Sequence, residues 1–231
     1  MKAFVLAGGS GSRMAPYTDV MPKCLLPVNG SPCVRIIIQR MLDSGIEEKD
    51  VVLCINEWAQ KHFAHEFRDL KIQFNISPRP YGTAGELADA SMLIENTNIL
   101  HYGDDLTKVD YFELINRHRE WNADLTLAST NQVYLNLGLI TIQNGMSNGR
   151  IVLWKEKPFL PSVLAWAAVA VFNRDFVDYL AVGKDISHDV IPRMMADGKK
   201  IYAYNSNSRW VDIGSLEHWK LANKLAKEGK I

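Results

Sequence analysis

The chain begins with the stretch Met1-Lys-Ala-Phe-Val-Leu-Ala-Gly-Gly-Ser-Gly-Ser-Arg-Met-Ala-Pro-Tyr-Thr-Asp-Val-Met-Pro-Lys-Cys24. The apolar run at 3–7 predicts a buried strand. Three glycines follow this run almost at once, at Gly8, Gly9 and Gly11. Because glycine has no Cβ, the backbone N–H groups of such a segment can turn toward an anion. The stretch therefore predicts a strand that ends in an anion-binding loop.

Two cations close to the glycines indicate which anion the loop would hold. Arg13 and Lys23 add fixed positive charge, which suits a polyphosphate. A P-loop would end in Gly-Lys-Ser/Thr, whereas Ser12 and Arg13 occupy that place. A dinucleotide-binding loop would carry a third glycine where Met14 stands. We therefore interpret the stretch as a triphosphate cradle of neither type.

Composition limits the classes of partner. Of 231 residues, 47% are hydrophobic and 23% charged, as in a globular protein with a full core. Lys and Arg number 26, as do Asp and Glu, so no net positive charge is available to attract nucleic acid. No apolar stretch reaches the roughly 20 residues of a membrane span, and no signal peptide is evident. The three cysteines, Cys24, Cys33 and Cys54, have no metal-binding spacing and favour reduced thiols in a cytoplasmic protein.

The rest of the chain alternates strands and helices and then changes character. We expect strands at 3–7, 51–55, 71–76, 98–102 and 124–129, with helices at 32–43, 56–69, 86–94 and 110–121. Strand-like runs at 135–143, 149–155 and 163–172 follow with only turns between them, and Asn144-Gly145 and Asn148-Gly149 are hairpin signals. Helices at 174–180 and 188–196, a strand at 200–204 and a last helix from 215 complete the chain.

This order predicts an α/β fold of Rossmann-like, three-layer type. Its mixed, mostly parallel sheet would be flanked by helices, because repeated strand–helix–strand units make parallel sheets with right-handed crossovers. We expect a single domain over 1–231. Its nucleotide-binding half would span about 1–129, and its sugar-phosphate-binding half about 130–231, with an antiparallel extension that covers the sugar.

The amino-terminal stretch resembles the sugar-1-phosphate nucleotidylyltransferase family, which includes glucose-1-phosphate thymidylyltransferases and mannose-1-phosphate guanylyltransferases. The resemblance lies in Leu6-Ala-Gly-Gly-Ser-Gly-Ser-Arg-Met-x-Pro-x-Thr together with Pro22-Lys23. It implies the nucleotide-diphospho-sugar transferase type of fold. It also implies that Arg13 and Lys23 are catalytic, and that nucleotide contacts come from Leu6, Ala7, Gly8, Gly9, Gly11 and Arg13.

A second glycine-containing loop matches the segment that lies against the base in this family. It is Gly82-Thr-Ala-Gly85, and the resemblance implies nucleotide contacts from Gly82, Thr83 and Gly85. By its residues alone the segment also suits a helix amino terminus capped by Thr83. Relatives that use thymidine or uridine nucleotides often carry a glutamine before this loop, where this chain has Pro80. The identity of the base therefore stays open.

Two aspartates are candidate ligands of Mg²⁺. Asp104 follows a predicted strand in Gly103-Asp104-Asp105, where a carboxylate would face the ligand crevice of an α/β sheet. The family has its metal-binding aspartate at this position, and a second one in the motif that matches Trp210-Val-Asp212-Ile-Gly214. The alternatives are a plain turn at Asp104 and a cap of the last helix at Asp212.

The later motifs concern the acceptor. Glu156-Lys157-Pro158 resembles the sugar-phosphate motif of the family, and Gly138 matches a glycine that lets backbone touch the sugar. On its residues alone, the triplet also suits a charged strand end before a proline turn. The chain departs from the family where Asn-Ala-Gly-Ile is usual, since it has Trp166 and Ala168 there. The identity of the sugar is therefore open as well.

The resemblance implies an enzyme that joins a nucleoside triphosphate to a sugar 1-phosphate, with Mg²⁺, to give a nucleotide sugar and pyrophosphate. Its partners would be these two substrates, without nucleic acid or membrane, and a homo-oligomer is compatible because relatives often assemble. Three alternatives remain at this point. They are a phosphocholine-type acceptor, nucleotide transfer to molybdenum cofactor, and a non-catalytic paralogue that binds sugar nucleotides. Pro22-Lys23 and the motif around Asp212 argue against the second.

Overall fold

The computed structural model describes residues 1–133, 137–145, 147–160 and 162–231. A seven-stranded sheet forms its centre, in the order β12-β8-β11-β6-β1-β4-β5. Its strands are β1 (Lys2–Leu6), β4 (Val51–Asn56), β5 (Gln73–Ser77), β6 (Thr97–Tyr102), β8 (Leu125–Thr130), β11 (Ala165–Asn173) and β12 (Ile201–Asn205). All pairs in it are parallel except those of β11 with β6 and β8. Strands from both predicted halves of the chain join this sheet.

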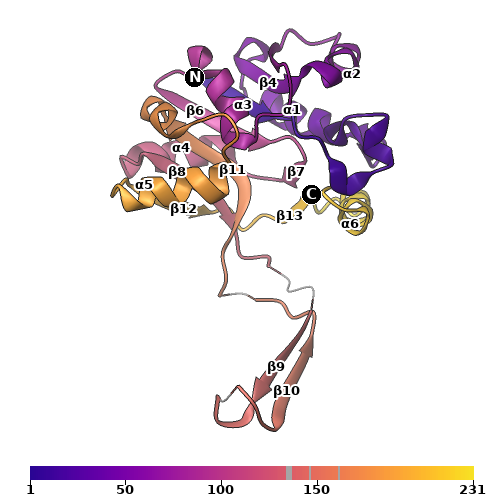
Figure 1. Cartoon of the computed structure of the whole chain (residues 1–231), viewed down its shortest axis with the longest axis vertical. Coiled ribbons are helices and arrows are strands. Elements are labelled where there is room, and N and C mark those ends of the chain that lie inside the picture. Colours follow the sequence, from indigo (N-terminus) through magenta and orange to yellow (C-terminus); the bar gives the residue numbers. More distant parts are fainter. Residues whose placement is uncertain (134–136, 146, 161) are drawn as a thin grey trace.

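Helices cover both faces of the sheet (Figure 1). They are α1 (Cys33–Asp43), α2 (Gln60–Glu66), α3 (Thr83–Asp89), α4 (Tyr111–Glu120), α5 (Ile191–Ala196) and α6 (Leu216–Lys227). Shorter helical turns lie at Ser12–Met14, Tyr17–Asp19, Lys23–Leu25, Glu48–Asp50, Glu57–Ala59, Ser91–Leu93, Gln143–Gly145, Arg174–Tyr179 and Ile186–Val190. The mostly parallel three-layer fold predicted from the sequence is confirmed.

The alternation of side chains along β1 shows how the two layers of the core arise. Ala3 and Val5 belong to the hydrophobic cluster that includes α1 and α6. Phe4 and Leu6 belong to the cluster on the other face, with α3 and α5. Successive residues of a strand point to opposite faces, so an unbroken apolar run is required where both faces are covered. The three cysteines are buried and free.

The strand-like run 163–172 behaves differently from the expectation. It was expected in an antiparallel extension, but its counterpart β11 lies inside the central sheet, between β6 and β8. Its residues from Ala167 to Phe172 are all buried, so both faces of this strand are covered. In the interior of a sheet, such an apolar run can form backbone hydrogen bonds on both edges and bury its side chains on both faces.

The other two runs form a hairpin outside the body of the protein. Strands β9 (Gly138–Ile142) and β10 (Ile151–Glu156) pair with each other in a separate two-stranded sheet. The hairpin projects away from the central sheet (Figure 1). The first residues of the predicted strand 135–143, at 135–136, lie outside the described residues. Two further ribbons are β2 (Pro27–Val28) with β3 (Ser31–Pro32), and β7 (Asp105–Thr107) with β13 (Trp210–Asp212).

Within the described ranges, no helix is both long enough and apolar enough to cross a bilayer.

Candidate active site

The loop after β1 is held at its start by buried hydrogen bonds. The Ala7 N–H donates to the Cys54 carbonyl oxygen at 2.8 Å, and the Gly8 N–H donates to the Glu86 carboxylate at 3.1 Å. The Asn56 side-chain amide donates to the Gly8 carbonyl oxygen at 2.8 Å. A Cβ on Gly8 would lie 2.9 Å from the Glu86 carboxylate. These contacts fix the backbone at Ala7 and Gly8, whereas the next residue, Gly9, is exposed.

Gly11 closes the loop on itself. Its φ of +65° is a conformation that favours glycine. A Cβ there would lie 2.9 Å from the methyl group of Thr18 and 3.1 Å from the Lys23 Cβ. The Thr18 hydroxyl donates to the Gly11 carbonyl oxygen at 3.0 Å. This folding back brings Lys23 beside the glycines, although the two lie a dozen residues apart.

The two predicted metal ligands are neighbours in the structure, although 108 positions separate them in the sequence. Asp104 follows the end of β6, next to β1, where the Gly103 N–H donates to the Leu6 carbonyl oxygen at 2.8 Å. In the β7–β13 ribbon Asp105 pairs with Asp212. The Ile213 N–H donates to the Asp104 carbonyl oxygen at 3.0 Å. The ribbon thus joins the segment after β6 to the segment before α6.

The cations lie at the same place. The Lys23 ammonium forms an ion pair with the Asp104 carboxylate, and both side chains are largely buried. Burial lowers the pKa of Lys23, but the Asp104 carboxylate together with the nearby Cys24 and Asp105 raises it, so that the pKa lies above its usual value. A Cβ built on Gly214 would lie 3.3 Å from Nη2 of Arg13, which places the exposed guanidinium beside the loop after Asp212.

The Asp212 carboxylate is held in a fixed orientation. The Gly214 N–H donates to one of its oxygens at 2.6 Å, and Nδ1 of His218 lies 2.7 Å from the other. Ser215 caps α6 by accepting a hydrogen bond from the His218 N–H at 3.2 Å. Asp212 is therefore not the cap, which removes that alternative. The sequence analysis missed His218, because the contact arises only when the first turn of α6 folds back onto Asp212.

The donor set suits a divalent cation that also binds phosphates. Mg²⁺ is commonly bound by one or two carboxylates together with substrate phosphates. Asp104 and Asp212 could supply the two carboxylates. Asp105 is next to Asp104 in sequence and opposite Asp212 in the ribbon, but it is buried, and the indole N–H of Trp210 donates to it at 2.6 Å. Its burial and the charges of Asp104 and Asp212 raise its pKa well above the usual value. No group of three or more potential metal-binding side chains occurs within the described part of the chain.

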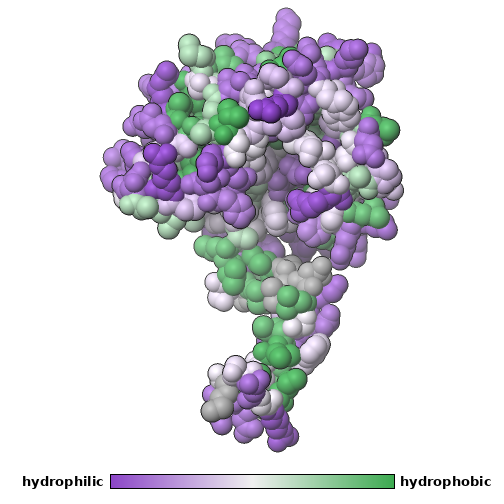
Figure 2. Space-filling view, viewed as in Figure 1, coloured by the Kyte–Doolittle hydropathy of each residue, from purple (hydrophilic) through white to green (hydrophobic). Residues whose placement is uncertain are grey.

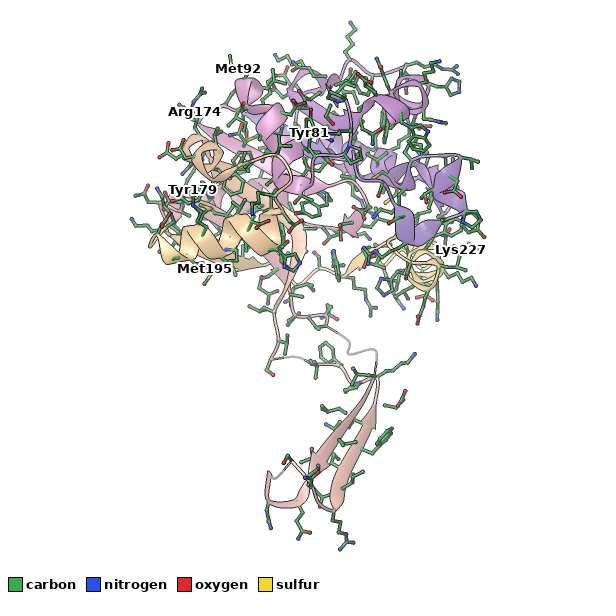
Figure 3. The ribbon with its side chains drawn as sticks, in the orientation of Figure 1. Tyr81, Met92, Arg174, Tyr179, Met195 and Lys227 are labelled. Atoms are coloured by element: carbon green, nitrogen blue, oxygen red, sulfur yellow. The ribbon has the colours of Figure 1, made fainter. Side chains whose placement is uncertain are left out.

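The second predicted nucleotide loop packs against the segment 182–186. Gly82 has φ +76°, and a Cβ there would lie 2.7 Å from the Lys184 carbonyl oxygen. A Cβ on Gly85 would lie 2.8 Å from Tyr81, which Figure 3 labels, and 3.0 Å from Val182. Both glycines are thus required for close backbone packing. Their contact with a nucleotide stays a prediction.

Thr83 has a different role from the helix cap considered above. Its hydroxyl donates to the Asp185 carboxylate at 2.9 Å and accepts from the Ile186 N–H at 2.8 Å. Helix α3 begins at this residue without a side-chain cap. The hydroxyl therefore ties the loop to 185–186.

Glu86 is a second residue that sequence reasoning missed. It is 4% exposed, and it joins the two loops because it lies on α3 and accepts from the Gly8 N–H. Burial raises its pKa to about 7; the bond from Gly8 opposes this shift, and the Asp104 charge adds to it. In the sequence, Glu86 is a single acidic residue between Gly85 and Leu87, which gives no sign of this contact.

The predicted sugar-phosphate residues lie apart from this cluster. Gly138 and Glu156 are paired in the projecting hairpin, and Lys157 follows β10. The ring of Trp154 covers Gly138, where a Cβ would lie 2.7 Å from it. None of the described residues between 138 and 156 belongs to either hydrophobic cluster. We expected an antiparallel extension that covers the sugar, but in the structure the β9–β10 hairpin projects away from the body of its own chain (Figure 1).

A cavity of about 170 Å³ lies next to Asp212. It is lined by residues near both ends of the hairpin segment and by the segment around Asp212, namely Thr130, Gln132, Val133, Ala165, Trp210, Val211, Asp212, His218 and Leu221. Trp166 and Ala168 lie nearby in β11, at a bulge where Ala168 has φ +57°. The indole N–H of Trp166 donates to the Val169 carbonyl oxygen at 2.9 Å.

Comparisons with known proteins show which sequences this chain is similar to. A sequence model of the family described as Nucleotidyl transferase matches residues 2–228. The chain is 31% identical over 233 residues to a mannose-1-phosphate guanylyltransferase of Mycobacterium tuberculosis, with 93% of the chain and 61% of the relative covered. It is 25% identical over 231 residues to a D-glycero-alpha-D-manno-heptose 1-phosphate guanylyltransferase of Aneurinibacillus thermoaerophilus, with 97% of each covered.

A third relative and a solved structure complete the comparison. A UTP–glucose-1-phosphate uridylyltransferase of Synechocystis is 24% identical over 254 residues, which cover all of the chain and 65% of the relative. The chain thus spans less than two thirds of the length of two of these three relatives. The structure of a putative glucose-1-phosphate thymidylyltransferase from Bacillus anthracis superposes with a TM-score of 0.75 at 19% identity, over 99% of the chain and 96% of its own length. It shares the fold.

Proposed function

Because the chain belongs to the nucleotidyl transferase family, we propose that it joins a nucleoside triphosphate to a sugar 1-phosphate and releases pyrophosphate. One observation carries the proposal. Three regions of the sequence, at residues 13–23, at Asp104 and at Asp212, bring Arg13, Lys23 and the two aspartates together beside the loop after β1. Two cations and two carboxylates beside a glycine-rich turn suit a reaction between two polyanions.

The chemistry would need positioning and charge compensation rather than a base. The attacking group is an oxygen of the sugar phosphate, which is already an anion. It would form a bond to the α-phosphorus while the bond between that phosphorus and the bridging oxygen to the β-phosphate breaks. The electron pair leaves with pyrophosphate, and no proton has to be removed. Such reactions gain most of their rate from alignment and from electrostatic stabilisation.

The residues take separate roles in this scheme. Arg13 would hold the β- and γ-phosphates as they leave, and Lys23 would contact the α-phosphate and the attacking phosphate. Lys157 would hold the sugar phosphate, and Glu156 would accept hydrogen bonds from sugar hydroxyls. Asp104 and Asp212 would hold Mg²⁺, which would supply further charge compensation at the α-phosphate. Lys23 also forms an ion pair with Asp104.

The nucleotide and the sugar are left open. The similar proteins include uridylyl-, guanylyl- and adenylyltransferases, so membership of the family does not decide the base. Pro80 before the second loop, and Trp166 and Ala168 near the cavity, differ from the residues usual in the family. The substrate specificity of a relative is therefore not transferred to this chain.

A substrate screen tests the proposal. The full chain would be incubated with Mg²⁺, each of five nucleoside triphosphates and a panel of sugar 1-phosphates, with phosphocholine as a further acceptor. Pyrophosphate release would be followed with a coupled pyrophosphatase, and products would be identified by mass spectrometry. We expect release with a restricted set of pairs and formation of the matching nucleotide sugar. Absence of release with every pair would contradict the proposal, and release only with phosphocholine would contradict the sugar acceptor.

A further inference from the structure

The β9–β10 hairpin exposes large apolar side chains that no described residue of its own chain covers. The exposed fractions are 61% for Trp154, 56% for Val152, 52% for Ile151, 44% for Leu153 and 44% for Ile140. Figure 2 shows apolar surface along the projecting hairpin and at its base. An isolated two-stranded hairpin is at best marginally stable in water, and contiguous exposed apolar surface marks an interaction site. The hairpin therefore requires a partner surface.

The pairing of the strands shows what the hairpin would bring to that partner. Trp154 lies opposite Ile140, and Glu156 lies opposite Gly138. Residues directly opposite each other share a face of the ribbon, and so do residues two apart along a strand. Trp154, Ile140 and Glu156 therefore lie on one face. A surface that covers the two apolar side chains also meets Glu156, and Lys157 follows at once.

The globular body shows where these residues are needed. In the proposed reaction Arg13 holds the departing β- and γ-phosphates, and Lys23 is shared between the α-phosphate and the attacking phosphate, so the sugar phosphate has no cation of its own in this cluster. The cavity beside Asp212 is the space available for a sugar next to the cluster. Yet the hairpin of the same chain points away from this part of the body (Figure 1). Each chain thus has one incomplete site and one uncovered arm that carries the missing groups.

We propose that two copies of this chain form a two-fold dimer in which each hairpin reaches the other copy. Glu156 and Lys157 of one protomer complete the sugar-phosphate subsite of its partner. A two-fold arrangement makes the exchange reciprocal, so that one interface covers both hairpins and completes both sites. This inference rests on the proposed function for the role of the two residues. The dimer itself does not depend on that function.

The first experiment measures the dimer without any use of activity. Sedimentation or light scattering would compare the full chain with an Ile140→Ser/Trp154→Ser variant. Met92→Ser serves as the matched control, because Met92 is 90% exposed and lies on the body away from the hairpin (Figure 3). We expect a dimer for the wild type and the control, and a monomer for the hairpin variant. A monomeric wild type, or a hairpin variant that still dimerises, would overturn the proposal.

The second experiment asks which protomer supplies Lys157. Arg13→Ala and Lys157→Ala chains would be co-expressed with two different affinity tags, and the mixed dimer would be isolated through both tags. If the hairpin acts on the partner, one of the two sites is intact, and we expect about half of the wild-type activity. A dimer of wild type with the Arg13→Ala/Lys157→Ala double variant would then have one defect in each site and show only residual activity.

Action within one chain reverses this pattern. The first mixed dimer would then be nearly inactive, and the second would keep about half of the activity, which would overturn the exchange. The two failures can be told apart. A wild type that is inactive with every substrate pair contradicts the proposed function, whereas the sedimentation result decides the dimer in either case.

Discussion

Arg13 and Lys23 are both cations of the candidate site, but the fold holds them differently. Lys23 is largely buried and paired with Asp104, so it also belongs to the structure of the site. Arg13 is exposed beside Gly214. A change at Lys23 would therefore disturb both charge balance and chemistry, whereas a change at Arg13 can report on the chemistry alone.

We expect Arg13→Ala to slow turnover while the protein stays folded. Removing one preorganised donor to a developing charge typically raises a barrier by about 3–4 kcal/mol, or roughly a few hundredfold in rate. The measurement is the steady-state kcat with the substrate pair found in the screen. Arg68→Ala is the matched control, because Arg68 is also an exposed arginine but lies after α2. Equal rates for the two variants would remove Arg13 from the mechanism.

Glu86 predicts a pH dependence of stability. Its pKa in the folded protein is about 7, above its ordinary value of 4.5, so between these values the folded state binds more protons than the unfolded state. Stability from this group is present in full below pH 4.5 and is lost as the pH rises through 7. The integrated effect is at most about 3 kcal/mol in the free energy of unfolding.

Denaturant unfolding at several pH values tests this effect. The stability of Glu86→Gln relative to the wild type should increase from pH 5 to pH 8, because glutamine cannot ionise and can still accept from the Gly8 N–H. Glu57→Gln, at an exposed position, should give a difference that does not vary with pH. A constant difference for Glu86→Gln would show that this carboxyl does not titrate as described.

At the scale of elements, glycines determine how closely the segments around the site approach. Gly82 has a positive φ, and a Cβ added to it would lie only 2.7 Å from a backbone carbonyl oxygen. Gly198 has a similar φ of +70°, but nothing lies within 4 Å of its Cβ position. Substitutions at Gly82 and Gly198 would therefore both strain the backbone, but only the one at Gly82 would also cause a steric clash between elements.

We expect Gly82→Ala to destabilise the protein more than Gly198→Ala. Both introduce strain of order 1–3 kcal/mol, but only the first also pushes α3 away from the 182–184 segment. Urea unfolding of both variants would measure the two free energies. Equal losses would mean that the loop relaxes without cost and that its packing does not depend on Gly82.

The β7–β13 ribbon shows how much of the position of the two aspartates could be predicted from the sequence. Asp104 lies at the end of a buried apolar strand next to β1, so its place at the edge of the sheet could be predicted from the order of strands. Asp212 could be assigned only through the resemblance of its motif. Its contact with the Asp104 segment depends on a three-residue ribbon, which is too short to give a periodic pattern.

At the scale of the whole molecule, the site depends on segments from both ends of the chain. The proposal predicts that a nucleoside triphosphate stabilises the protein against heat only when Mg²⁺ is present, because a ligand stabilises the state that binds it. Asp212→Asn should weaken this stabilisation, and Asp178→Asn, at an exposed position in another region, should preserve it. Thermal unfolding with and without a chelator is the measurement. Stabilisation that is unaffected by the chelator would contradict a metal-assisted site.

The sequence by itself determined the layers of the fold, and it predicted an anion-binding loop after β1. Both follow from local patterns, namely apolar runs of strand length, their alternation with helices, and glycines followed by cations. The tertiary structure alone decided the insertion of β11 into the sheet, the contacts of Glu86 and His218, and the outward position of the hairpin. These features depend on which distant surfaces pack together, and the sequence of a single strand or helix does not specify the element that it packs against. The same apolar residues can face their own core or remain exposed for a second chain, as in β9 and β10.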